Sequence, residues 1–195
     1  MHYALSLSSF NRFIMQIDNS ERLKFRLMDT DDAQALWALD QDPAVMKFLN
    51  GGKPTSIEQV NNVFIPRMAK YRDSKLGWGI WQVSDKITDE YLGWVLIRPM
   101  AFFTESPNFT DLELGWRFFQ STWGKGYATE AAIAIKDAVV AHSDVTHVSA
   151  LAVADNLASV GVMKKMGMSF VRAYLHKDPI GDFDAVHYQM SVSKH

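Results

Sequence analysis

The clearest pattern in the sequence is an alternation of apolar residues with other residues that starts at Leu112 and ends at Phe119. A period of two is typical of a β-strand whose two faces differ. One face carries Leu112, Leu114, Trp116 and Phe118, and the other carries Glu113, Gly115, Arg117 and Phe119. The pattern therefore predicts a strand that separates an apolar face from one with charged groups.

A glycine-containing turn and an alanine-rich helix are predicted directly after this strand. Gly124 and Gly126 flank Lys125, and the helix is expected from about Tyr127 to Ala141. The first N–H groups of a helix have no partner inside it, and the helix dipole places partial positive charge there. Glycines remove the side chains that would keep a phosphate away from these donors. The stretch predicts an anion-binding cradle, although an ordinary strand–turn–helix connection carries the same glycines.

Two other phosphate motifs do not fit this stretch. The dinucleotide fingerprint G-x-G-x-x-G needs a third glycine where Thr129 stands. The P-loop G-x-x-x-x-G-K-[ST] needs its lysine after the second glycine, whereas Lys125 precedes Gly126. Neither motif is therefore assigned.

The remaining segments predict the element order β-α-α-β-β-β-α-β-α-β-β, which is an α+β fold with a mixed sheet. Further strands are expected at residues 22–28, 78–83, 91–97, 148–153, 170–175 and 185–192. A long loop is expected at residues 99–110, and a turn at residues 179–182. The expected helix boundaries are a cap at Thr30, a break near Pro43, a capping box at Thr55-x-x-Glu58, a kink near Pro66, a cap at Asp155 or Asn156 and an end at Gly167.

Length and charge narrow the function classes. The 195 residues suit one domain, which we expect over residues 20–195, with residues 1–19 as an N-terminal extension. The formal net charge of −2 supplies no basic surface, which argues against nucleic acid as a direct partner. No apolar run reaches the roughly eighteen residues of a membrane span, so no membrane partner is expected. The first nineteen residues lack the basic start and apolar centre of a secretion signal.

The chain contains no cysteine, which excludes disulfides, thiolate zinc sites and cysteine nucleophiles. This composition fits a reducing compartment, and we expect a cytoplasmic protein. His142 and His147 flank a loop without the spacing of metal ligands, and no metal site is predicted. His187 is expected on the face of the last strand that lies opposite Val186 and Tyr188.

Three sequence blocks together resemble one known family. The segment Trp123-Gly-Lys-Gly-Tyr-Ala-Thr-Glu-Ala131 resembles the acetyl-CoA pyrophosphate loop of the GNAT acyltransferases, in their ribosomal-protein N-acetyltransferase (RimJ/RimL-like) branch. The block from Asn156 to Met168 resembles the family's next motif, and the block from Glu21 to Leu27 resembles the opening strand of the branch. The resemblance covers roughly residues 20 to 192 and implies the GNAT acyl-CoA N-acyltransferase fold. That fold is a mixed, mostly antiparallel sheet with flanking helices and a splayed central strand pair.

The resemblance also implies an acetyl-CoA site. Its pyrophosphate is expected on the backbone donors of the cradle, and its pantetheine arm on free strand edges near Trp116 and Phe118. Asn156 is expected to cap its helix and to contact the cofactor. The expected cofactor-binding residues are Trp116, Phe118, Trp123, Gly124, Lys125, Gly126, Tyr127, Ala128, Thr129 and Asn156.

Two residues are candidates for proton transfer. Glu113 lies where a carboxylate could deprotonate the amine, but an ion pair with a basic residue on a neighbouring strand is an equally good interpretation. Asp111 is a weaker competitor for the same role. Many family members have a tyrosine acid where this chain has Met163, and Ser159 is the replacement that the branch suggests. A serine in a first helical turn also commonly bonds to backbone.

The resemblance implies an N-acetyltransferase that uses acetyl-CoA and transfers the acetyl group directly to an amine. The acceptor is expected to be the N-terminal amine of a (ribosomal) protein. A small amine such as a polyamine, an amino acid or an antibiotic is the alternative, and a homodimer is compatible with the resemblance. A third interpretation is a non-catalytic acyl-CoA-binding module, which the cradle, Glu113 and Ser159 argue against.

Overall fold

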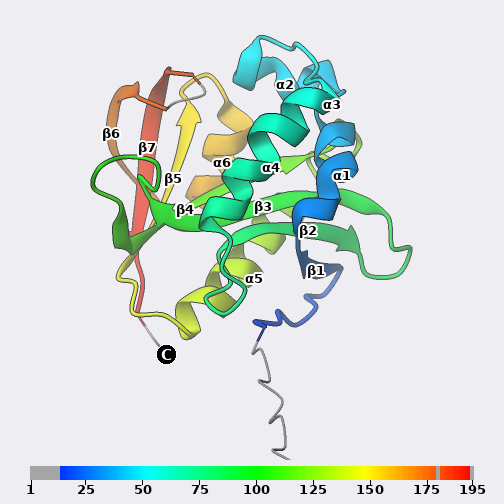
Figure 1. Cartoon of the computed structure of the whole chain (residues 1–195). Helices are drawn as coiled ribbons and strands as arrows, with labels where there is room; N and C mark the ends of the chain where they lie inside the picture. Colours follow the sequence, from blue (N-terminus) through cyan, green and yellow to red (C-terminus); the bar gives the residue numbers. More distant parts are fainter. Residues whose placement is uncertain (1–13, 179–180, 194–195) are drawn as a thin grey trace, which may run out of the picture.

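A computed structural model describes residues 14–178 and 181–193. Its centre is a seven-stranded sheet in the order β1-β2-β3-β4-β5-β7-β6, with helices on both faces (Figure 1). Among the strands of the described residues, only β4 and β5 pair in parallel. The predicted α+β class with a mixed, mostly antiparallel sheet is confirmed. The strands are β1 Leu23–Leu27, β2 Gly79–Asp85, β3 Tyr91–Met100, β4 Asn108–Phe118, β5 His147–Val153, β6 Ser169–His176 and β7 Phe183–Ser191.

Two apolar clusters hold helices against opposite faces of this sheet. Helices α5 and α6 cover one face, where Leu114 and Phe118 pack with Ile135 of α5 and Met163 of α6. Helices α1 and α4 belong to a second cluster that contains Met68. The described helices are α1 Ala33–Leu39, α2 Pro43–Asn50, α3 Ile57–Gln59, α4 Ile65–Tyr71, α5 Tyr127–Ala141 and α6 Leu157–Lys165, with short 3₁₀ turns at Thr30–Asp32 and Gln120–Thr122.

Two predicted helix caps are wrong by one residue. Asp29, not Thr30, caps the first turn, because Asp29 and Asp32 complete a reciprocal capping box. Helix α3, for which Thr55 was the predicted cap, begins after Ser56, whose side chain accepts a hydrogen bond from the N–H of Gln59. Thr55 is buried instead, and its carbonyl accepts a hydrogen bond from the Gln41 side chain. Adjacent hydroxyl and carboxylate residues offer alternative caps, and the tertiary contacts select one of them.

The predicted interruption near Pro66 is confirmed and has a defined form. Residues Val60–Phe64 make one π-helical turn between α3 and α4, and the N–H of Ile65 bonds to the carbonyl of Val60. Proline has no N–H for the regular helical bond. A π turn just before Pro66 accommodates this loss without ending the helix.

The long loop predicted at residues 99–110 is shorter than expected. β3 extends to Met100 and β4 begins at Asn108, because these two residues pair after a register shift next to Pro99. Part of the predicted turn at residues 179–182 lies outside the described residues, as do residues 1–13 of the expected N-terminal extension. Within the described part of that extension, Met15 and Ile17 are buried in the core.

The central strand pair is splayed, as predicted. β4 and β5 pair only at three positions, from Asp111 opposite His147 to Glu113 opposite Ser149. Beyond Glu113, β4 continues to pair with β3, while β5 continues to pair with β7. The two strands therefore separate toward their C-terminal ends.

In the two described stretches of the chain, no helix is both long and apolar enough to cross a membrane.

Candidate active site

The gap between β4 and β5 exposes backbone groups on its β4 side. The N–H of Phe119 donates a 3.1 Å hydrogen bond to the carbonyl of Leu92 on β3. Since backbone groups alternate in direction along a strand, those of Trp116 and Phe118 face away from β3, toward the gap. The carbonyl of Phe118 already accepts a 2.8 Å hydrogen bond from the Trp123 ring nitrogen. Trp116 and the N–H of Phe118 can therefore pair with an extended ligand arm, and Trp123 marks the far end of the gap.

The predicted cradle lies at the start of α5 and is open. Gly126 is the N-cap with φ of 81°, and no side chain caps the helix. Gly124 also has a positive φ, and a Cβ atom placed there would meet nothing within 4 Å. The first-turn N–H groups of Tyr127, Ala128 and Thr129 are thus unobstructed by a cap. This arrangement fits a diphosphate.

Arg22, which directly precedes β1, holds the start of this cradle through contacts that were not predicted. Its guanidinium forms a 2.6 Å ion pair with Glu130 of the first turn of α5 and donates a 3.0 Å hydrogen bond to the carbonyl of Lys125. Ser20 donates a second hydrogen bond to Glu130, at 2.7 Å. Burial raises the pKa of Glu130, but the hydrogen bonds from Ser20 and Arg22 outweigh it and lower this pKa below its ordinary value.

The side chains of Lys125 and Trp123 are exposed. Lys125 adds a cationic group at the cradle's outer rim, where it is free to contact a phosphate or solvent. Trp123 keeps its ring at the rim through its bond to Phe118. Their exposure leaves the backbone as the main binding element.

The start of α6 carries two further predicted site residues, Asn156 and Ser159. The side chain of Asn156 caps α6 by accepting a 3.2 Å hydrogen bond from the N–H of Ser159. The hydroxyl of Ser159 is half-buried and has no hydrogen-bond partner in the described part of the chain, so the backbone-bonded alternative does not apply. Met163 is fully buried in the core, which explains why an apolar residue suits that position.

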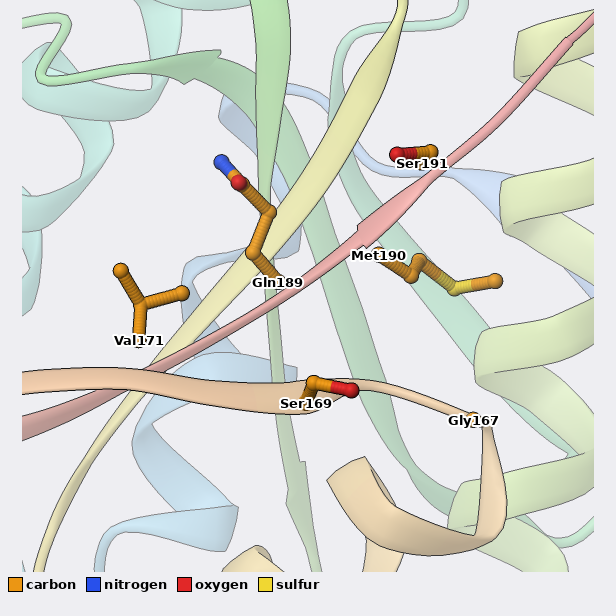
Figure 2. Close-up of a pocket in the computed structure, with 6 residues that line it drawn as sticks. All are labelled: Gly167, Ser169, Val171, Gln189, Met190 and Ser191. Atoms are coloured by element: carbon orange, nitrogen blue, oxygen red, sulfur yellow. The ribbon is translucent and has the colours of Figure 1, made fainter.

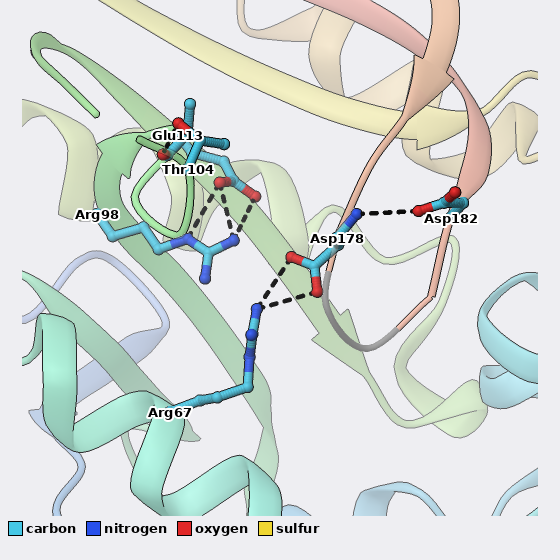
Figure 3. A network of polar contacts seen from close by, with 7 residues as sticks. Arg67, Arg98, Thr104, Glu113, Asp178 and Asp182 are labelled. Atoms are coloured by element: carbon cyan, nitrogen blue, oxygen red, sulfur yellow. Dashed lines mark hydrogen bonds and ion pairs between the residues drawn. The ribbon is translucent and has the colours of Figure 1, made fainter. Parts of the chain in front are cut away.

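Glu113 is held by an arginine on the neighbouring strand. It lies directly opposite Arg98 in the β3–β4 register. The guanidinium donates hydrogen bonds of 2.9 to 3.1 Å to both carboxylate oxygens (Figure 3). Of the two interpretations of Glu113, the ion pair is the one that this arrangement favours.

A second ion pair lies beside the first and joins α4 to the segment between β6 and β7. Arg67 of α4 binds both carboxylate oxygens of Asp178, which lies between β6 and β7 (Figure 3). Its guanidinium lies 3.7 Å from the ring centre of Phe103, and Arg98 lies over the same ring at 5.3 Å. Only about 20 Å³ of free volume remains in the cavity lined by Phe102, Phe103, Glu113 and Asp178, among others.

The arginines of this cluster were not identified from the sequence. Arg67 and Arg98 come from α4 and β3, far from any recognised motif. Arg98 could have been found only through the register that places it opposite Glu113. Arg117, which lies on the same face of β4 as Glu113, forms its ion pair with Asp40.

A larger hollow lies elsewhere on the sheet and contains none of the predicted site residues. It has a volume of about 380 Å³ and lies where β6 begins beside the end of β7 (Figure 2). Ser169, Val171 and Gln189 line it, with Gly167, Met190 and Ser191. We assign it no role in the reaction.

Comparisons with known proteins agree with this geometry. A family model described as "Acetyltransferase (GNAT) domain" matches residues 22–169. The uncharacterized protein YkkB of Bacillus subtilis is 32% identical over 154 residues, which cover 77% of this chain and 84% of YkkB.

Two solved structures show the same fold with coenzyme A bound. A structure of RimL, titled "Ribosomal L7/L12 alpha-N-protein acetyltransferase in complex with Coenzyme A", superposes with a TM-score of 0.69 at 16% identity, covering 92% of this chain and 98% of that one. The aminoglycoside acetyltransferase AAC(6')-Ib in complex with coenzyme A superposes with a TM-score of 0.67 at 15% identity, covering 87% and 94%. At these identities the likeness establishes the fold alone.

Proposed function

The chain belongs to the GNAT acetyltransferase family, and from this premise we propose that it acetylates a small amine. As a family member it is an acetyl-CoA-dependent N-acetyltransferase, so the proposal concerns only its acceptor and its site residues. Fold and cosubstrate do not choose the acceptor, because the fold hosts both protein and aminoglycoside acetyltransferases.

The closure of the acceptor side carries this proposal. We place the acceptor on the sheet face that bears Glu113, beside helix α4, because the core packs α5 and α6 against the other face. The Arg67–Asp178 pair and the rings of Phe102 and Phe103 crowd that approach and leave about 20 Å³. A protein N-terminus needs a groove for several residues of backbone, whereas a compact amine needs only small side-chain movements.

The rival proposal is a RimJ/RimL-like enzyme of the cytoplasm that modifies the N-terminus of a ribosomal protein. The sequence of the cradle and the similarity to the RimL structure support it. It requires the Arg67–Asp178 contact to part widely enough to admit a peptide.

We assign the acetyl-CoA contacts to the backbone of the cradle and of β4. The N–H groups that follow Gly124 and Gly126 would hold the diphosphate, and those near Trp116 would pair with the pantetheine arm. Asn156 caps the start of α6 through the N–H of Ser159 and leaves the Ser159 hydroxyl available. Ser159 is our candidate donor of a proton to the departing thiolate.

The deciding experiment is a competition between acceptor classes. Release of CoA is measured with acetyl-CoA and a panel of polyamines, amino acids and aminoglycosides, and in parallel with ribosomal-protein N-terminal peptides. The proposal predicts kcat/KM at least tenfold higher for one small amine than for any peptide. A peptide that is the best acceptor would support the rival, and acetylation of neither class would refute both.

A further inference from the structure

A buried polar chain crosses three strands on the sheet face of Glu113. The hydroxyl of Ser149 on β5 donates a 2.8 Å hydrogen bond to Asp111 on β4. Nε2 of His187 on β7 lies 2.9 Å from the same hydroxyl oxygen, and the Gln189 amide donates to both Ser149 and Asp111. His187 had been expected on the face of its strand opposite Val186 and Tyr188, and that prediction is confirmed, because those two residues pack in the core of the other face.

These hydrogen bonds fix which nitrogen of His187 carries the proton. Since the Ser149 hydroxyl proton is committed to the Asp111 carboxylate, the hydroxyl oxygen can only accept from Nε2. The neutral ring is therefore protonated at Nε2, which leaves Nδ1 with a free lone pair. Nδ1 is buried and has no partner among the described residues. His187 itself is 7% exposed, so an unpaired nitrogen there is costly unless it serves a purpose.

His187 also lies where the central strands part. The last pair between β4 and β5 is Glu113 with Ser149, and His187 bonds to that same Ser149. In the β5–β7 register His187 faces Leu151, two residues into the splayed segment. His187 is therefore one strand away from the gap, at the level where β4 and β5 begin to part. Glu113, by contrast, already has both carboxylate oxygens bound to Arg98.

We propose that Nδ1 of His187 accepts the proton that the acceptor ammonium must lose before it attacks the thioester. Ser149 and Asp111 act as positioning residues that hold the ring in the Nε2–H form. This inference rests on the proposed acetyl transfer and assigns its base.

Acetyl transfer moves two protons away from the acceptor ammonium. One proton passes from the ammonium to Nδ1, directly or through one water, and frees the nitrogen lone pair. This nitrogen bonds to the carbonyl carbon, and the carbon–sulfur bond breaks. Ser159 donates its hydroxyl proton to the departing thiolate and regains one from the acetylated nitrogen, and the imidazolium then returns its proton to solvent.

The charges around His187 suit a neutral base near pH 7. Burial lowers the pKa of His187, the Asp111 carboxylate raises it, and the Arg172 guanidinium lowers it. Arg172 lies opposite His187 in the β6–β7 register and stacks on Tyr174. The net shift is downward, so the ring is unprotonated at neutral pH, and the Asp111 charge stabilises the imidazolium that forms during turnover.

The tautomer can be tested without any acceptor. Long-range ¹H–¹⁵N spectra of the unaltered, histidine-labelled protein across pH 5 to 8.5 should show His187 neutral at pH 7 with its proton on Nε2. Ser149→Ala should convert this signal to a mixture of tautomers. A proton on Nδ1, or a charged ring at pH 7, would overturn the proposal even if the acceptor were still unknown.

Kinetics test the role itself with the best acceptor found in the panel. His187→Gln should lower kcat/KM about 100-fold and remove the acidic limb of its pH profile, while the Kd of acetyl-CoA measured by calorimetry stays within twofold. The control is His142→Gln, at the exposed end of α5, which should change neither. Full turnover in a folded His187→Gln protein would refute the assignment. If no amine is acetylated by the unaltered protein, the proposed function fails, and the spectra still decide the state of His187.

Discussion

Arg98 and Glu113 face each other across β3 and β4, and the guanidinium binds both carboxylate oxygens at 2.9 to 3.1 Å. Their side chains are only 12% and 14% exposed. A pair this shielded from water is costly to break on one side, because the remaining charge stays desolvated. The pair neutralises the charge of Glu113 on this face of β4.

The first prediction is a strong coupling between these two residues. Arg98→Met should lower the free energy of unfolding by about 2 to 3 kcal/mol, since it leaves Glu113 without its partner. The double variant with Glu113→Gln should recover part of that loss. Urea unfolding of the parent, both single variants and the double variant gives the coupling energy. If the losses of the two single variants add up to that of the double variant, the coupling energy is zero and the ion pair itself does not stabilise the fold.

The second prediction concerns Gly126 in the cradle and Gly167 at the end of α6. Both have positive φ, and a Cβ atom at either would meet at most one atom within 4 Å. Leucine at either position should therefore cost a similar amount of stability, about 1 to 2 kcal/mol. Only Gly126→Leu should weaken acetyl-CoA binding, by tenfold or more, because its side chain would enter the diphosphate site. Calorimetric titration with acetyl-CoA measures this, and equal affinities of the two variants would remove the cradle assignment.

The third prediction is a loss of folding stability at acidic pH that is caused by protonation of the Glu130 carboxylate. Its pKa is lowered in the folded protein relative to the ordinary value of 4.5. The stabilising contribution is therefore fully present above pH 4.5 and is lost as the pH falls through the lower folded value. Because Arg22 is 41% exposed, we expect only about 1 kcal/mol.

Glu130→Gln should flatten the dependence of melting temperature on pH below 4.5 and leave its shape above pH 6 unchanged. Asp137→Asn on the exposed side of the same helix serves as the control. If the slopes of Glu130→Gln and the parent coincide between pH 3 and 4.5, the contact between Arg22 and Glu130 does not depend on the carboxylate charge.

The fold and the cradle were predictable because their signals are local. Alternation defined the β4 faces, and the glycines around Lys125 defined the start of α5. The resemblance to the GNAT family also implied the parted strands. Caps failed where neighbours such as Ser56 and Thr55 offered the same chemistry.

The charged half of the site was not predictable, because it depends on strand register and loop closure. Arg98 meets Glu113 only through pairing across β3 and β4, and Arg67 meets Asp178 across 111 residues of sequence. His187 reaches Asp111 only through Ser149 on a third strand. No spacing in the sequence encodes such contacts.

The last prediction is that the Arg67–Asp178 pair limits acceptor size. The pair joins α4 to the segment between β6 and β7, and its side chains are 15% and 14% exposed. Arg67→Met removes the hydrogen bonds and the contact with Phe103, so the cavity beside that ring should widen. For the preferred amine, kcat/KM should fall about tenfold, while amines one or two carbon atoms larger should gain relative to it.

Arg67→Lys keeps the charge but not the two-oxygen contact and should give an intermediate shift. Arg26→Met is the control, because Arg26 lies on β1 outside the cluster and its side chain is 52% exposed. The measurement is kcat/KM across a series of amines of increasing length. An unchanged order of preference in Arg67→Met would mean that this pair is a structural tie only, and acceptor size would then have to be set by Phe102 and Phe103.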